Sequence, residues 1–124
     1  METRKRRKAL ILDGEPPFEK LLNMMMALPD WECEIVTSRE KAVDRLKAAH
    51  FDVLITEYHM PQGNAFHFVC CLRQEGINLP AIVMSSDAQA LRLTPKELLS
   101  IPAVLLKPFS ASELNAALNA ALSA

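Results

Sequence analysis

The chain has 124 residues, half of them hydrophobic, and its 14 basic and 15 acidic residues give a formal net charge of −1. This length fits one domain that can bury a continuous core. The balanced charge excludes an overall field that would attract nucleic acid or a membrane surface. The basic residues that do cluster lie between Arg4 and Lys8. We therefore predict a solvated basic tail over residues 1–7 and a single domain over residues 8–124.

Cysteine usage and hydropathy indicate the compartment. The three cysteines, Cys33, Cys70 and Cys71, are an odd number, and no Cys/His spacing matches the patterns of zinc sites. We expect them to be small buried hydrophobes in a reducing environment. The sequence contains neither a signal peptide nor an apolar run long enough to cross a bilayer. The expected location is the cytoplasm, without membrane contact.

Short apolar segments alternate with helical patterns along the chain. In order, the expected strands cover residues 9–12, 34–37, 52–56, 81–84 and 103–106. The segments that begin the helices between and after them are Pro16-Pro17, Ser38, Asn64, Thr94-Pro95-Lys96-Glu97 and Ser110-Ala111-Ser112-Glu113. Residues 87–93 fit either a loop or a loose helical turn. The alternation predicts an α/β fold with a doubly wound, five-stranded parallel sheet and helices on both faces.

Polar residues follow the predicted strands at their carboxyl ends, where such a sheet binds its ligands. They are Asp13, Gly14 and Glu15 after the first strand, Glu57 after the third, Ser85 after the fourth and Lys107 after the fifth. Carboxylates, a hydroxyl and an ammonium at one edge of a sheet can form a site for an oxyanion or a cation. The sequence therefore predicts a polar pocket at this edge.

Four motifs carry a resemblance to a known family: Leu12-Asp13-Gly14-Glu15-Pro16, the segment from Asp52 to Met60-Pro61, Ile82 to Ser86, and Lys107-Pro108-Phe109. Their register and spacing resemble the receiver domains of two-component response regulators from Lys8 onward. The resemblance implies a flavodoxin-like sheet of the chemotaxis-receiver kind, with strand order 2-1-3-4-5. It also implies that Glu57 occupies the phosphoacceptor position and that Val104 occupies the position of a switch residue.

The sequence departs from the family pattern at these positions. Members of the family use an aspartate acceptor and a Mg²⁺ ion, and the matching ligand positions here are Gly14, Glu57 and the carbonyl of His59. Glycine has no oxygen to offer a hard cation, and glutamate moves the acceptor carboxylate by about 1 Å, which upsets in-line transfer. We expect no cofactor, with Asp13 and Glu57 as weak candidates for Mg²⁺. Val104 replaces the aromatic ring that family members pair with the hydroxyl of Ser85, and valine is stiff at χ1.

The altered pocket on an otherwise intact motif set suggests a receiver-like, non-enzymatic module that signals by protein contact, without ordinary aspartyl phosphorylation. Its expected partner is a sensor kinase, a phosphotransfer protein or an output domain, with no nucleic acid bound by this domain. The partner surface, which would also serve a homodimer, is expected on the fourth helix, fifth strand and fifth helix, with Leu91, Leu98, Leu99, Ala117 and Ala121. A Glu57–Lys107 ion pair would imitate a permanent active state or be only a structural salt bridge.

Two other functions stay open. The first is a working phosphorelay receiver with an unusual acceptor, for which Asp13 and Asp87 are available. The second is a small cofactor-binding enzyme, which is less favoured because the sequence has only Gly14, Gly63 and Gly76 and no glycine-rich phosphate loop. The partner, the oligomeric state and the presence of an output domain after Ala124 are not determined by these residues.

Overall fold

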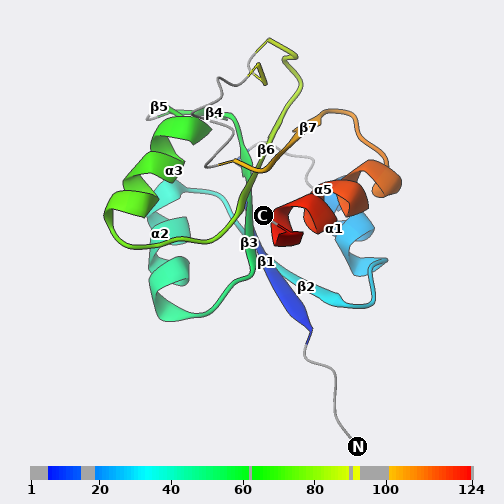
Figure 1. Cartoon of the computed structure of the whole chain (residues 1–124), viewed down its shortest axis with the longest axis horizontal. Helices are drawn as coiled ribbons and strands as arrows, with labels where there is room; N and C mark the ends of the chain where they lie inside the picture. Colours follow the sequence, from blue (N-terminus) through cyan, green and yellow to red (C-terminus); the bar gives the residue numbers. More distant parts are fainter. Residues whose placement is uncertain (1–5, 15–18, 62, 90, 93–100, 124) are drawn as a thin grey trace, which may run out of the picture.

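A five-stranded parallel sheet forms the centre of the molecule (Figure 1). The computed structural model describes residues 6–14, 19–61, 63–89, 91–92 and 101–123. The strands are β1 (Arg7–Leu12), β2 (Trp31–Val36), β3 (Val53–Glu57), β6 (Ala81–Ser85) and β7 (Ala103–Leu106), in the order β2-β1-β3-β6-β7. Their pairs are all parallel. Taken in chain order, these are strands 2-1-3-4-5, so the predicted fold class and strand order are confirmed.

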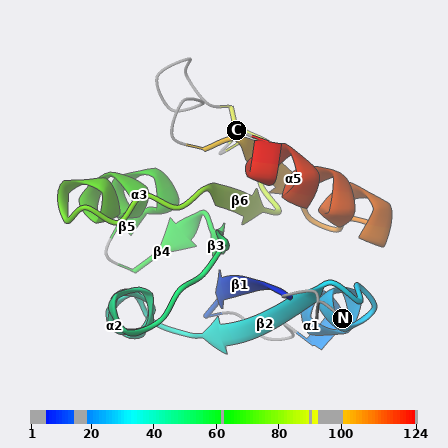
Figure 2. The same cartoon turned by 60° about the horizontal axis from the view of Figure 1, so that its bottom comes forward.

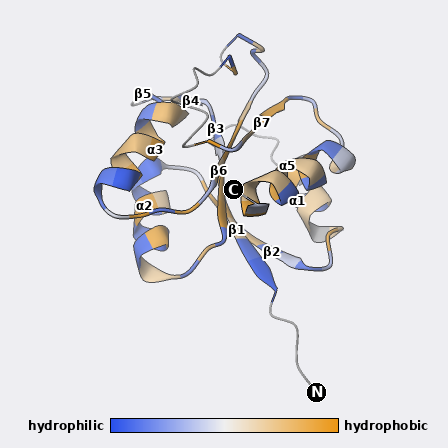
Figure 3. Cartoon of the chain, in the orientation of Figure 1, coloured by the Kyte–Doolittle hydropathy of each residue, from blue (hydrophilic) through white to orange (hydrophobic). Residues whose placement is uncertain are grey.

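Helices cover both faces of the sheet (Figures 1 and 2). The helices α2 (Arg39–Ala48) and α3 (Ala65–Gln74) lie on one face, and α1 (Glu19–Met26) and α5 (Ala111–Ser123) lie on the other. A two-residue antiparallel pair, β4 (His59–Met60) with β5 (Gly63–Asn64), lies between β3 and α3. The hydropathy colours of Figure 3 show the hydrophobic residues concentrated on the central strands, as expected where helices cover both faces.

The predicted helix starts are borne out where the structure describes them. The Ser38 hydroxyl accepts a hydrogen bond from the backbone N–H of Lys41, and the Asn64 side chain accepts one from that of His67. Ser110 and Glu113 form a reciprocal capping box, with 3.1 Å between each backbone nitrogen and the other side chain's oxygen. The Thr94 capping sequence and Pro16 lie outside the described residues.

Two predicted boundaries at the start of the sheet are wrong. Strand β1 begins at Arg7, two residues before its predicted start at Ala9. Strand β2 begins at Trp31, three residues before the predicted start, because Arg7 and Lys8 pair with Trp31 and Glu32. The sheet thus extends over polar residues that the hydrophobic pattern alone does not mark as strand.

The core also corrects part of the predicted partner surface. Ala117 and Ala121 are buried in the cluster between the sheet and the helices α1 and α5, with exposed fractions of 7% and 0%. With Leu114 and Leu118 they form the i, i+3, i+4, i+7 stripe by which α5 packs on the sheet. These two alanines therefore stabilise the fold and are not available to a partner.

The leucines of that predicted surface have different outcomes. Leu91 is half-buried and packs against a small cluster of Ala65, Val83 and Ile101. Leu98 and Leu99 lie outside the described residues. Among the helices that the structure does describe, none has the length and apolar character needed to span a membrane.

Candidate functional site

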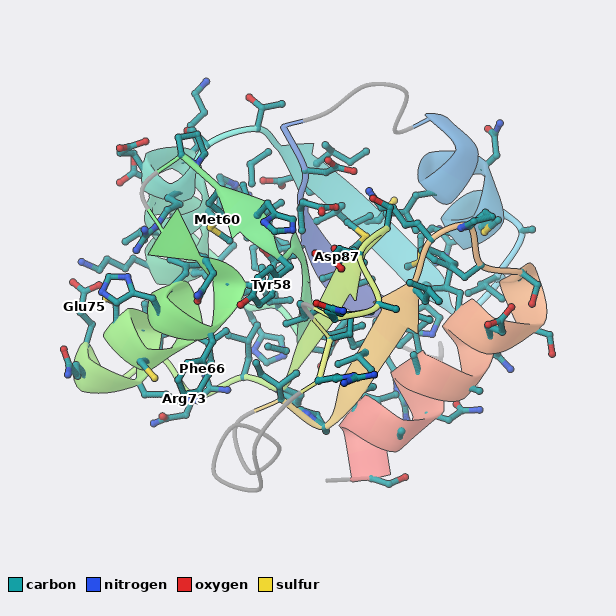
Figure 4. All side chains as sticks on the ribbon, turned by 90° about the horizontal axis from the view of Figure 1, so that it is seen from above. Tyr58, Met60, Phe66, Arg73, Glu75 and Asp87 are labelled. Atoms are coloured by element: carbon teal, nitrogen blue, oxygen red, sulfur yellow. The ribbon has the colours of Figure 1, made fainter. Side chains whose placement is uncertain are left out.

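Polar side chains from four strands meet at the carboxyl edge of the sheet. Asp13 follows β1, Glu57 and Ser85 are the last residues of β3 and β6, and Lys107 follows β7. Asp13, Glu57 and Ser85 are buried, with exposed fractions of 3%, 7% and 0%. Figure 4 views the molecule from this edge, with Tyr58 and Met60 on one side and Asp87 beyond them. The structure brings Asp13, Glu57 and Lys107 into contact at this edge, and Glu15 lies outside the described residues.

Lys107 is the cation at the centre of this site. Its Nζ lies 2.8 Å from Glu57 Oε2 and 3.5 Å from Asp13 Oδ2. The side chains of the two carboxylates are only 9% and 4% exposed, and that of Lys107 is 29% exposed. Among the described residues, no donor makes a hydrogen bond of good geometry to Glu57 Oε2. Its 2.8 Å contact with Lys107 Nζ is therefore an ion pair.

The electrostatics of the site keep Lys107 protonated. Burial lowers the pKa of this lysine, but the contact with Glu57 and the negative charges of Asp13 and Glu57 together outweigh burial, so the pKa lies above its ordinary value of 10.5. One ammonium therefore serves two buried carboxylates, each of which would be costly to bury as an ion alone.

Gly14 leaves space beside this ion-pair cluster. A cleft of about 290 Å³ opens there, lined by Leu12, Gly14, Thr37, Ser38, Arg39, Glu57, His59, Met60 and Pro61. A Cβ atom at position 14 would lie 3.4 Å from the carbonyl oxygen of Thr37, which is an ordinary van der Waals contact. A Cβ atom at this position is thus sterically acceptable.

The residues of the cleft fit Mg²⁺ poorly. This ion requires a nearly octahedral shell of oxygen atoms and gives up water reluctantly. Gly14 supplies no side-chain oxygen, and Lys107 already contacts both Asp13 and Glu57. Over the ranges that the structure describes, no three His, Cys, Asp or Glu side chains are arranged to hold a metal ion. In the described part of the site, the ammonium of Lys107 contacts both carboxylates.

Comparison with known proteins identifies the family. A family model for the response regulator receiver domain matches residues 9–119. The chain belongs to the response regulator receiver domain family. It is therefore a receiver domain of two-component signalling, a class of signalling module.

Individual relatives agree with this assignment. The sensor protein EvgS of Escherichia coli K12 is 30% identical over 81 residues, which are 65% of this chain and 7% of EvgS. The transcriptional regulatory protein BasR of the same strain is 24% identical over 116 residues, 93% of this chain and 52% of BasR. The chain thus spans about half of one curated relative and a small part of the other.

Solved structures agree on the fold. A sensor protein from Polaromonas sp. JS666 superposes with a TM-score of 0.80 at 21% sequence identity, with 95% of this chain and 97% of that chain covered.

The structure places the predicted switch residue Val104 and the Ser85 hydroxyl of this receiver domain as follows. Val104 lies on the edge strand β7 and is 37% exposed, with no ring to move. The Ser85 hydroxyl accepts a hydrogen bond from the backbone N–H of Asp87 at 3.0 Å. The Ser85 carbonyl accepts one from the backbone N–H of Lys107 at 2.8 Å. The hydroxyl is thus held within its own loop.

Two features of this receiver domain's cleft, the position of Arg39 and a contact of His59, were not predicted from the sequence. Arg39, the first residue of α2, lines the cleft beside Glu57. His59 Nε2 lies 4.0 Å from Asp87 Oδ2, which links β4 to the loop after β6. No local pattern indicates either contact, because each joins segments that are far apart in sequence.

Proposed function

We propose that this receiver domain signals by contact with another signalling protein and without Mg²⁺-dependent aspartyl phosphorylation. The observation that carries the proposal is the position of Lys107 Nζ, 2.8 Å from Glu57 Oε2. The atom that would have to attack a phosphoryl donor is already in an ion pair. Phosphoryl transfer depends on positioning and on neutralised charge, and the longer acceptor and Gly14 weaken both.

The ion pair is proposed to hold the domain in a single signalling state. In this proposal Glu57 extends to the place of a phosphoryl oxygen, and Lys107 contacts it there. A carboxylate has less charge and fewer acceptor oxygens than a phosphate, so the imitation is partial. Because Lys107 directly follows β7, a change in this pair has a short path to the edge strand.

An amide-resonance experiment separates a signalling pair from a purely structural salt bridge. We expect Glu57→Gln to shift amide resonances along β7, at Val104 and Leu106, as well as those in the cleft. A salt bridge without signalling content predicts shifts confined to the cleft.

The proposed partner is a sensor kinase, a phosphotransfer protein or an output domain. EvgS and BasR, which match this chain, are a sensor protein and a transcriptional regulatory protein by name. Exposed apolar residues suit such a contact, since Val104 and Leu106 on β7 are 37% and 45% exposed. We place the domain in the cytoplasm, where its cysteines, free in the structure, stay reduced.

A working phosphorelay receiver is the second candidate, and membership of the family favours it. Both candidates are tested by incubating the protein with acetyl phosphate and Mg²⁺ and measuring its intact mass. We expect no stoichiometric phosphoryl adduct. An adduct on Glu57, Asp13 or Asp87 would overturn our proposal and establish the second candidate.

A further inference from the structure

His67 and Cys71 lie one turn apart on α3, and their side chains touch. Cys71 Sγ is 3.9 Å from His67 Nε2. Residues at i and i+4 of a helix face the same direction, and here their two metal-binding atoms converge on one point. We propose that this pair binds Zn²⁺ or a similar transition-metal ion, at a site separate from the carboxyl edge of the sheet.

The separation of the two atoms is close to the value that zinc requires. Zinc bonds of about 2.3 Å to sulfur and about 2.0 Å to nitrogen, at a tetrahedral angle, place the two ligand atoms about 3.5 Å apart. The observed 3.9 Å needs a closure of only a few tenths of an ångström, which side-chain rotation supplies. His67 is exposed and Cys71 is half-buried, so an ion can reach both from solvent.

The surroundings of the pair attract a cation. His67 and Cys71 line a groove of about 590 Å³ between α2 and α3, whose charged residues are Arg39, Glu40, Asp44 and Glu75. The three carboxylates outnumber the one guanidinium, which lies over the ring of Phe68 at 4.9 Å. Figure 4 shows Glu75 toward the far end of α3, where Lys47 pairs with it at 3.1 Å. Glu40 and Asp44 of α2 add two further carboxylates to the lining of the same groove.

The site supplies two protein ligands as it stands. Among the described residues no third His, Cys, Asp or Glu completes a set, so the remaining positions go to water or to a carboxylate of α2 that rotates toward the ion. Binding requires the Cys71 thiolate, so the thiol proton is released to solvent and the affinity rises with pH. No four-ligand zinc pattern occurs in the sequence, so the spacing of His67 and Cys71 alone did not predict a zinc site.

The test is a titration of the reduced, intact chain with Co²⁺, followed by displacement with Zn²⁺. We expect a thiolate-to-Co²⁺ charge-transfer band that disappears when Zn²⁺ is added. We also expect His67→Ala and Cys71→Ser each to lower the Co²⁺ affinity at least tenfold. The matched control is Cys70→Ser, which changes the neighbouring thiol on the same helix and should bind as the parent does.

Three results would overturn the proposal. They are the absence of the charge-transfer band in the parent, a band that survives Cys71→Ser, and a band that Cys70→Ser removes to the same extent. Circular dichroism shows whether each variant is folded. If His67→Ala or Cys71→Ser unfolds, alkylation protection of the parent decides, because bound Zn²⁺ should slow the reaction of Cys71 with iodoacetamide and leave that of Cys70 unchanged.

Discussion

Replacing Lys107 with methionine tests the electrostatic account of the cleft most sharply. The substitution keeps much of the aliphatic side chain and removes the ammonium that contacts both Asp13 and Glu57. Their side chains are 4% and 9% exposed, so water replaces the lost ammonium poorly. We expect Lys107→Met to lower the free energy of unfolding near neutral pH.

The size of the loss follows from the burial of the site. Removing one partner of a fully buried ion pair costs about 3–5 kcal/mol, and the 29% exposure of the Lys107 side chain reduces this. We expect a loss of about 2–3 kcal/mol. At an unfolding entropy of about 2.1 cal/mol/K per residue, this lowers the melting temperature of a chain of this length by about 8–12 °C.

The assay is chemical denaturation of the parent and the variant, with Lys47→Met as the matched control. Lys47 pairs with Glu75, and these side chains are 55% and 46% exposed, so the control should lose less than about 1 kcal/mol. If Lys107→Met loses no more than Lys47→Met, the ion-pair cluster does not stabilise the fold and the reasoning fails.

Three further predictions follow from the same geometry. Glu57→Asp alone should give no phosphoryl adduct with acetyl phosphate and Mg²⁺, whereas Glu57→Asp with Gly14→Asp should give one by intact mass; an adduct on the single variant would show that Gly14 is not limiting. The pKa of Lys107 is raised above 10.5 in the folded state. The contribution of Lys107 to the free energy of unfolding is therefore complete below about pH 10.5 and is lost as the pH rises through the folded pKa. Denaturant titrations at alkaline pH should show this loss in the parent and not in Lys107→Met. Ala121→Leu should lower the free energy of unfolding by about 1–3 kcal/mol because position 121 is fully buried. Ala120→Leu, at an exposed position, should change it by no more than about 0.5 kcal/mol. Equal losses of stability in thermal melts would contradict the packing of α5.

The fold could be predicted because its central strands are almost wholly apolar. Strands β1, β3 and β6 end in residues buried from both faces, and this pattern is readable without tertiary information. The edge strand β2 was placed less well, since exposed Glu32 interrupts its hydrophobic pattern. The alternation of strands and helices predicted a parallel sheet with helices on both faces, because parallel crossovers have one hand. The strand order was implied by the resemblance to the receiver domain family.

The membership of the site and its Glu57–Lys107 ion pair could also be predicted from the sequence, but its other contacts could not. Residues after parallel strands meet at one edge, which brings Asp13, Glu57 and Lys107 together. That Lys107 contacts both carboxylates depends on rotamers and on side-chain reach, which no spacing rule gives. For the same reason, the approach of Arg39 to the cleft and the contact of His59 with Asp87 could not be predicted from the sequence.

The error at Ala117 and Ala121 has a simpler cause. The alanines of the last helix were grouped by composition, as small residues suited to helix contact. Their positions relative to Leu114 and Leu118 place them in the inner stripe of α5, and periodicity carries that information. The exposed Val104 and Leu106 of β7 are the better candidates for the partner surface.

The central claim is that the ammonium of Lys107 takes the place of a divalent ion in this receiver domain. An amide NMR titration with millimolar Mg²⁺, compared with the same titration of the Glu57→Asp, Gly14→Asp variant, tests it directly. We predict that the resonances of residues 13, 14, 57 and 59 stay in place in the parent and shift in the variant. Saturable shifts of these residues in the parent would contradict the claim.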